Sequence, residues 1–184
     1  MENNDVVNAI KVLKEMIQDR GYIIDIVEND DNSNDTNDEN ETTFCIKGRR
    51  NNDIILCFLE EDDKLNIQGI KDKISVMNKE GSKKCIIVYR SSVTSSAKKS
   101  LETLEYEFEL FGMHELQLNI TKHRLVPNHA RVTPSEKNEL DLKYKGKLPF
   151  ILSQDAVSRY YGFTKGEYVR ITRKNGSIIY RLVK

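Results

Sequence analysis

The sequence predicts a protein of mixed helices and strands, of the α/β or α+β class, divided into two domains at residues 1–118 and 119–184. Three observations lead to this prediction. Apolar residues recur at helical spacing in some segments and form strand-length runs in others. The two parts carry opposite net charge. The second part ends in a strong hairpin signal, Asn175-Gly176.

Composition excludes several classes of protein. The chain has 184 residues, of which 29 are Lys or Arg, 29 are Asp or Glu and 38% are apolar. The longest apolar runs, Ile54–Leu59 and Cys85–Tyr89, fall far short of the ~20 residues that span a bilayer. The first residues also lack the basic and apolar blocks of a secretory signal. We therefore expect a globular intracellular protein without membrane contact.

The cysteines and histidines do not predict a metal site. Cys45, Cys57 and Cys85 are widely spaced, and each lies in an apolar run. His123 and His129 are close to each other but have no cysteine near them in sequence. We expect reduced, buried cysteines and no metal or other cofactor.

The net charge of zero hides a division. Residues 1–118 contain 15 basic and 24 acidic residues, a net charge of −9, whereas residues 119–184 contain 14 basic and 5 acidic residues, a net charge of +9. An acidic loop, residues 28–42, supplies much of the N-terminal deficit and is expected to be mobile. The C-terminal excess has no comparable source. This division predicts two modules with different partners.

The N-terminal module is predicted to interleave helices with strands. Apolar residues at three-to-four spacing predict a first helix, which ends at Gly21. Ile67, Ile70, Ile74 and Met77 predict a second helix. A third helix would be capped by Thr94, Ser95 or Ser96. The apolar face of the first helix comprises Val6, Val7, Ile10, Leu13, Met16 and Ile17, and the expected strands are 22–27, 43–47, 53–59, 85–89, 105–110 and 115–120.

A metal-dependent nuclease is one alternative for this module. Such a site needs an Asp on one strand and an acidic-x-Lys triplet on its neighbour. Asp53 and the run Asp62-Asp63-Lys64 supply these residue types. However, a strand of about seven residues would separate them by some 20 Å. A solvated turn explains these charges better than a catalytic site does.

The C-terminal module has clear helix signals. Thr133-Pro134-Ser135-Glu136 is a capping box, which predicts a helix running to about Lys145 with Leu140 and Tyr144 inward. Residues 148–152 should be extended. A shorter helix should then begin at Asp155 or Ser153 and end at Gly162.

The terminal hairpin should place two arginines opposite each other. Asn175-Gly176 favours a two-residue type I′ turn. The register then pairs Val169 with Leu182 on one face and Arg170 with Arg181 on the other. Two facing arginines repel one another unless an acidic group lies between them. Either they splay into solvent, or they mark a docking surface.

Several short motifs follow one another along the chain. The N-terminal one is Thr94-Ser95-Ser96-Ala97-Lys98. The C-terminal ones are Asn119-Ile120-Thr121-Lys122-His123, Leu125-Val126-Pro127-Asn128-His129, Glu136-Lys137 with Leu140, Leu148-Pro149, Asp155, Tyr160-Tyr161-Gly162, Lys165-Gly166 and Tyr180-Arg181-Leu182-Val183. Together they resemble a known family, the fifth, jaw-forming common subunit of eukaryotic RNA polymerases and its archaeal homologue, in which the N-terminal motif is similar to a T-P-S-A loop. The resemblance is specific over residues 119–184 and looser but collinear before them.

The resemblance implies a non-catalytic subunit of a DNA-directed RNA polymerase. It implies an N-terminal, restriction-endonuclease-like three-layer jaw domain near downstream DNA and a small α+β assembly domain that docks on the largest subunit. Other polymerase subunits and transcription factors are the further partners it implies. The compartment would be the nucleus for a cellular protein, or the virion, host cytoplasm or host nucleus for a viral one. The docking residues would include His123, Leu125, Val126, Pro127, His129, Tyr160, Tyr161, Gly162, Arg170 and Arg181.

The resemblance also implies a local DNA contact. Hydroxyls and helix-start amides hold a phosphate backbone without reading bases. Ser95 stands where the family usually has proline, so the loop on the DNA side would be less stiff. Ala156 stands where Asp-Pro is usual, which removes a preference for starting a helix there. A stand-alone nuclease or a DNA-binding factor remains the alternative. The expected residues on the DNA side are Thr94, Ser95, Ser96, Ala97, Lys98 and Lys99.

Overall fold

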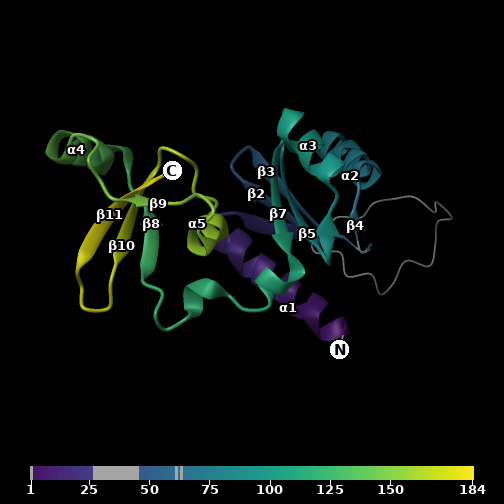
Figure 1. Ribbon diagram of the computed structural model, residues 1–184, viewed down its shortest axis with the longest axis horizontal. Helices are drawn as coiled ribbons and strands as arrows, with labels where there is room; N and C mark the ends of the chain where they lie inside the picture. The colour runs from purple at the N-terminus through teal and green to yellow at the C-terminus, as the bar shows by residue number, and fades with distance from the viewer. Residues whose placement is uncertain (1, 27–45, 61, 63) are drawn as a thin grey trace. The chain divides into compact units, whose positions relative to one another are not determined.

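The computed structural model of the chain (Figure 1) divides into two compact units, residues 1–118 and residues 119–184. The described residues combine α-helices, short 3-10 helices and three sheets, which confirms the predicted mixed class. The acidic loop 28–42 and Cys45 lie outside the described residues. The structure describes residues 2–26, 46–60, 62 and 64–184.

The N-terminal unit is built on a five-stranded sheet of order β1-β2-β3-β5-β7. The first three strands are antiparallel, and β3, β5 and β7 are parallel. The short strands β4 and β6 pair with each other. The elements are α1 (Glu2–Asp19), β1 (Ile23–Ile26), β2 (Ile46–Arg50), β3 (Asp53–Leu59), β4 (Lys64–Leu65), α2 (Ile67–Glu80), β5 (Lys84–Tyr89), β6 (Ser92–Val93), α3 (Ser95–Thr103), β7 (Glu107–Gly112) and the 3-10 helix η1 (Met113–Leu116).

Helices cover both faces of this sheet (Figure 1). α2 and α3 pack on one face, where Leu56, Phe58 and Ile87 of the strands join Met77 and Ala97 of the helices in one buried cluster. α1 packs on the other face. It approaches β2 closely at Gly48, where a Cβ atom would lie only 2.9 Å from the Ile17 side chain. The expected strand ended at residue 47, whereas β2 continues through Gly48 to Arg50.

α1 buries a narrower face than the sequence predicts. Leu13, Met16 and Ile17 are fully buried, as expected from their spacing. Val7, predicted on the same face, is 58% exposed. At 100° per residue, Val7 lies well away from the line through Leu13 and Met16. Val7 therefore lies outside the buried face of the helix, which includes Ala9 and Val12 instead.

One buried ion pair lies in the core of this unit. Lys73 Nζ of α2 is 2.7 Å from Glu60 Oε2, and the two side chains are 5% and 9% exposed. The ammonium group also lies 5.7 Å from the centroid of the Phe58 ring. The nearby strands bury Cys57 and Cys85, as predicted. The core thus holds two charges that the hydrophobic pattern alone does not predict.

The C-terminal unit has a four-stranded sheet of order β8-β10-β11-β9. β8, β10 and β11 are antiparallel, and the edge strand β9 is parallel to β11. The core on one face comprises Ile151, Phe163, Val169, Ile171 and Val183. The elements are η2 (Ile120–Lys122), β8 (Asn128–Arg131), α4 (Pro134–Tyr144), β9 (Phe150–Ile151), α5 (Ala156–Tyr161), β10 (Tyr168–Thr172) and β11 (Ile178–Val183).

Both predicted C-terminal helices are present. The Thr133 hydroxyl accepts the Glu136 amide at 3.4 Å, and Asp155 accepts the Val157 amide at 3.0 Å. Gly162, at φ 62°, ends α5 as expected. Glu136 differs from the predicted capping box, because its carboxylate accepts the Tyr180 hydroxyl at 2.8 Å. The Glu136 carboxylate, which was predicted to cap the start of α4, therefore binds a tyrosine of the sheet instead.

The predicted strand at residues 115–120 is wrong. The structure has the 3-10 helices η1 and η2 there. Glu115 stabilises the start of η1, because its carboxylate accepts a hydrogen bond from the Gly112 amide at 2.7 Å. A local side-chain bond of this kind competes with strand pairing. β8, which the sequence did not predict as a strand, pairs with β10 instead.

The predicted hairpin register is also wrong. Arg170 pairs with Tyr180, and Arg181 pairs with Val169, so the two arginines point to opposite faces. The Gly176 amide donates to the Arg173 carbonyl at 2.9 Å, and Gly176 has a φ of 80°. Asn175 stays at negative φ, which a type I′ turn does not allow. The loop is therefore three residues long, and the extra residue shifts the register by one.

Candidate docking and nucleic-acid surfaces

The loop before α3 is held firmly at its first residue. The Thr94 hydroxyl accepts the Ala97 amide at 3.3 Å, and the Thr94 amide donates to the Leu65 carbonyl at 3.1 Å. Ala97 is buried in the core. Of the residues predicted on the DNA side, those with exposed side chains are Ser95, Ser96, Lys98 and Lys99. Two hydroxyls and two ammonium groups thus remain available to a phosphate, while Thr94 and Ala97 hold the loop in place.

The predicted docking residues near residue 125 form a compact, exposed turn. The Leu125 amide donates to His123 Nδ1 at 3.3 Å, and the Val126 amide donates to the His123 carbonyl at 3.0 Å. Leu125 is 74% exposed, whereas Val126 and Pro127 are half-buried. His123 therefore shapes a turn whose most prominent apolar side chain is Leu125.

Two other predicted docking residues are buried. His129 is 8% exposed, and its Nδ1 lies 2.8 Å from the Pro127 carbonyl. Burial lowers the pKa of this imidazole, against the opposing effect of the Pro127 carbonyl. Tyr160 is 3% exposed and accepts the Asn119 side-chain amide at 2.8 Å. These side chains can affect docking only through the shape of the surface above them.

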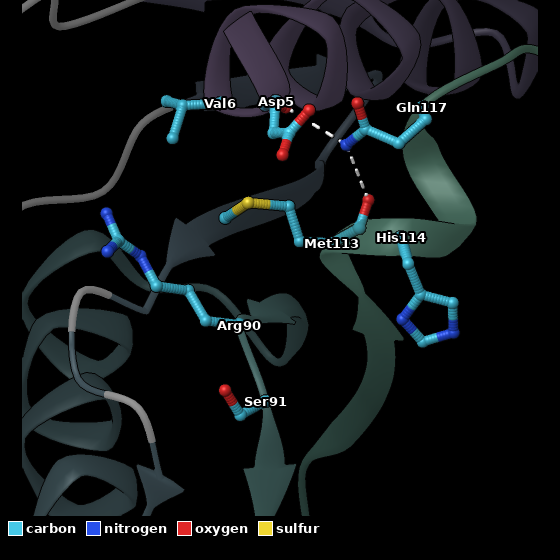
Figure 2. A pocket seen from close by; sticks show the side chains of 7 residues that line it. All are labelled: Asp5, Val6, Arg90, Ser91, Met113, His114 and Gln117. Atoms are coloured by element: carbon cyan, nitrogen blue, oxygen red, sulfur yellow. Dashed lines mark hydrogen bonds between the residues drawn. The ribbon is translucent and has the colours of Figure 1, made fainter. Parts of the chain in front are cut away.

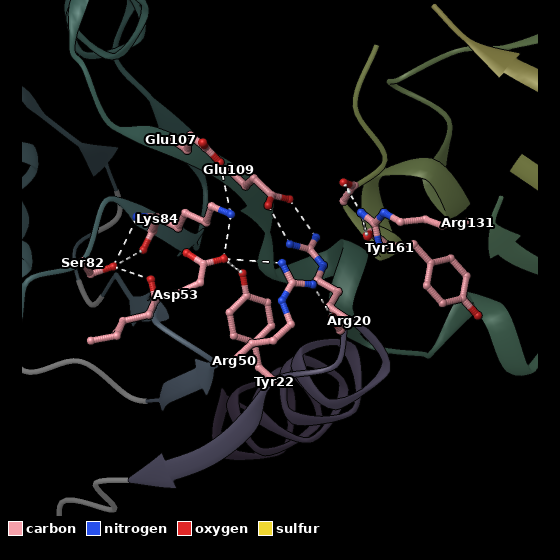
Figure 3. Close-up of polar contacts among 12 residues, drawn as sticks. Arg20, Tyr22, Arg50, Asp53, Ser82, Lys84, Glu107, Glu109, Arg131 and Tyr161 are labelled. Atoms are coloured by element: carbon pink, nitrogen blue, oxygen red, sulfur yellow. Dashed lines mark hydrogen bonds and ion pairs between the residues drawn. The ribbon is translucent and has the colours of Figure 1, made fainter. Parts of the chain in front are cut away.

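Arg131, which the sequence analysis did not select, organises the end of α5. Its guanidinium donates to the carbonyls of Tyr161 and Gly162 at 3.0 and 2.7 Å (Figure 3). It also pairs with Glu167 at 3.2 Å and lies 5.0 Å from the centroid of the Phe163 ring. An arginine at this position satisfies the last carbonyls of a helix. Tyr161 and Gly162 are half-buried beneath these contacts.

Arg170 and Arg181 do not form one docking site. Arg170 Nη1 lies 3.6 Å from Glu136 Oε1, on the face that α4 covers. Arg181 Nη1 donates to the Phe150 carbonyl at 3.1 Å. Each guanidinium therefore has its own partner within the unit, and the predicted repulsion between them is absent.

The acidic residue considered for nuclease chemistry lies in a structural network. Asp53 Oδ2 lies 2.8 Å from Lys84 Nζ and accepts the Tyr22 hydroxyl at 2.7 Å (Figure 3). Arg50 is 3.4 Å away. Burial raises the pKa of Asp53, but the bonds from Lys84 and Tyr22 outweigh it and lower the pKa overall. Asp53 and Asp62 flank β3 at its two ends, as the separation argument requires.

Close by in Figure 3 lies a second ion pair that the sequence did not predict. Arg20 donates to both carboxylate oxygens of Glu109, at 2.6 and 2.8 Å (Figure 3). The Arg20 side chain is only 5% exposed. Bidentate pairing of this type fixes orientation, so it ties the end of α1 to β7. No periodicity in the sequence indicates which acid this arginine meets.

A cavity of about 330 Å³ lies beside the first turns of α1. The Gln117 side chain closes one wall, because its Nε2 donates to the carbonyls of Asp5 and Met113 at 3.1 and 2.9 Å (Figure 2). Its lining mixes one guanidinium, one carboxylate and a thioether. The residues are Asp5, Val6, Arg90, Ser91, Met113, His114 and Gln117.

The part of the chain that the structure describes shows neither a cluster of metal ligands nor a membrane-spanning helix. There, no group of three or more His, Cys, Asp or Glu side chains is arranged to hold a metal ion. Among the same residues, no helix combines the length and apolarity needed to cross a membrane.

Comparison with known proteins identifies the family. The family model described as "RNA polymerase Rpb5, C-terminal domain" matches residues 118–183. The chain is 35% identical to "DNA-directed RNA polymerases I, II, and III subunit rpabc1" of Dictyostelium discoideum, over 97% of both chains. It is 39% identical to subunit RPABC1 of Caenorhabditis briggsae, over 71% of this chain and 66% of that one. The chain therefore belongs to the family of the RNA polymerase subunit RPABC1, or Rpb5.

Proposed function

We propose that this chain is a non-catalytic subunit of a multisubunit DNA-directed RNA polymerase. The observation that carries the proposal is the similarity to the Dictyostelium relative along 97% of both chains, because that relative is named as a subunit of RNA polymerases I, II and III. The proposed partners are the other polymerase subunits and transcription factors, without a cofactor. The compartment is the nucleus for a cellular protein.

The C-terminal unit is the proposed assembly domain, and the largest polymerase subunit is its proposed partner. The exposed turn at Leu125 supports this assignment. The Leu125 side chain is 74% exposed on a hydrogen-bonded turn, so covering it with a partner would remove apolar surface from water and favour binding. His129 and Tyr160 are buried beneath the surface of this unit, and Arg131 holds the end of α5.

The N-terminal unit is the proposed restriction-endonuclease-like jaw domain. Its order supports the assignment: a helix, three antiparallel strands, a crossover helix and a parallel strand β5. Ser95, Ser96, Lys98 and Lys99 supply the proposed contact with downstream DNA. The net charge of −9 on residues 1–118 restricts that contact to a local one.

A stand-alone nuclease is not favoured. Asp53 is held by Lys84, Tyr22 and Arg50, and among the described residues no group of three or more His, Cys, Asp or Glu side chains is arranged to hold a metal ion. A nuclease site needs converging carboxylates that gather a divalent cation.

Affinity purification of the tagged chain from its own cells tests the proposal. We expect the large polymerase subunits to co-purify in stoichiometric amounts, as quantified by mass spectrometry. The tag expressed alone is the control. Recovery of the chain alone, without any polymerase subunit, would contradict the proposed function.

A further inference from the structure

The edge strand of the C-terminal sheet carries an exposed apolar surface. Phe150 and Leu152 are 53% and 54% exposed. Hydrogen bonds link the backbone from Pro149 to Ser153 with β11 and the chain end beyond it, so the segment is extended. Side chains two residues apart on such a segment point to the same side. We call Phe150, Leu152 and the neighbouring Lys184 the Phe150 surface.

The Phe150 surface is positively charged. Lys184 Nζ lies 5.1 Å from the centroid of the Phe150 ring. Lys145 and Lys147, in the turn just before β9, are exposed. None of the ion pairs found among the described residues involves these three lysines. Their charge is therefore available to a partner.

The acidic residues of the same unit are mostly engaged. Residues 119–184 contain five acidic residues against fourteen basic ones. Glu136 and Asp141 bind the tyrosine hydroxyls of the sheet, Glu167 pairs with Arg131, and Asp155 caps α5. Four of the five carboxylates are thus already engaged, and the fifth, Glu139, is exposed on α4. Neutralising the Phe150 surface is therefore left largely to a partner.

The backbone of the edge strand is partly blocked. Arg181 donates to the Phe150 carbonyl at 3.1 Å, which occupies one of the two lone pairs of this acceptor. We therefore expect a partner to bind mainly through side chains. An aromatic ring under an ammonium group, next to a leucine, fits apolar side chains flanked by carboxylates.

We propose that the Phe150 surface docks an acidic segment of another polymerase subunit that also carries aromatic or aliphatic side chains. This inference rests on the proposed function and names the face and the partner chemistry. It is distinct from the turn at Leu125, which belongs to a different part of the chain.

Capture of the polymerase by tagged variants of the full chain tests the inference. We expect Phe150→Glu with Leu152→Glu to retain about tenfold less of the largest subunits than the wild type, because the partner loses two apolar contacts and meets two like charges. The matched control is Val7→Glu with Ile23→Glu, which changes two apolar residues of the N-terminal unit that are 58% and 74% exposed. Circular dichroism melting confirms that each variant is folded.

The charge of the partner is tested separately. Lys184→Glu should lower capture severalfold, whereas Lys165→Glu, an equally radical change at another exposed lysine, should not. If the wild type captures the polymerase and the folded Phe150 variant captures it equally well, the docking face is wrong and the proposed function stands. An equal loss of polymerase capture in both double variants would also contradict the proposed docking face. If the wild type itself captures no polymerase, the proposed function fails.

Discussion

The ammonium group of Lys73 depends on a single carboxylate. With both side chains of the Lys73–Glu60 pair less than 10% exposed, each charge is stable only because the other is present. Lys73→Met should therefore lower the free energy of unfolding by about 3–5 kcal/mol, because Glu60 is left buried and uncompensated.

Urea denaturation of the full chain measures this cost. The double variant Lys73→Met with Glu60→Leu is the control, and it should recover most of the loss because no buried charge remains. A single variant as stable as the wild type would show that Glu60 has another partner.

Arg170 stabilises the hairpin through Glu136, on the face that also carries Tyr180. Arg170→Glu should lower the free energy of unfolding by about 1 kcal/mol, because two carboxylates would then face each other at a partly exposed site. The control is Arg173→Glu in the exposed loop of the hairpin, which should have little effect. Equal effects at both positions in urea denaturation would contradict this assignment.

His129 should make stability depend on pH. Burial lowers the pKa of its imidazole below the ordinary value of 6.5, although the Pro127 carbonyl and Asp155 oppose this and Arg181 adds to it. The unfolded state therefore binds more protons below pH 6.5, and stability is lost as the pH falls through the folded-state pKa.

A urea denaturation series from about pH 7.5 to about pH 5 measures this dependence. His129→Gln should flatten the curve over that range, because it removes the titrating group. Parallel curves for the variant and the wild type would assign the pH dependence to other groups.

At the scale of elements, the starts and ends of helices could be predicted from the sequence more reliably than strand partners. Thr133, Asp155 and Gly162 act through bonds to residues two to four positions away, so their signals are local. The hairpin register instead depends on the φ of Asn175, which residue type does not determine. The bidentate pair of Arg20 and Glu109 spans most of the N-terminal unit, and no pattern indicates it.

The packing of α1 on the sheet gives a prediction at this scale. Gly48→Ala should destabilise the chain by about 1–3 kcal/mol, because its Cβ would lie 2.9 Å from Ile17 and 3.1 Å from Ile55. Gly69→Ala is the control in α2, where the nearest atom is 3.4 Å away. It should stabilise the helix by about 0.5–1 kcal/mol.

Urea denaturation of both variants gives the comparison directly. A stabilised Gly48→Ala variant would mean that α1 can move away from the sheet at no cost.

At the scale of the whole chain, the opposite charges of the two units were visible in the sequence, but the partners of those charges were not. The sequence counts fourteen basic residues after residue 118. The contacts in the folded chain distinguish two kinds of basic residue. Arg131 caps α5, whereas Lys184 lies over the exposed ring of Phe150. Composition therefore predicts that the C-terminal unit has acidic partners, and the contacts decide which of its basic groups can reach them.

The charge division also predicts how the free chain meets DNA. With a net charge of zero and a proposed DNA contact limited to the α3 loop, the full chain should bind duplex DNA more weakly than about 10⁻⁴ M at physiological salt. Fluorescence anisotropy with a labelled duplex measures this affinity. Micromolar binding with a steep salt dependence, unchanged by Lys98→Ala with Lys99→Ala, would place the main DNA contact on the basic C-terminal unit. That result would favour the alternative of a DNA-binding factor.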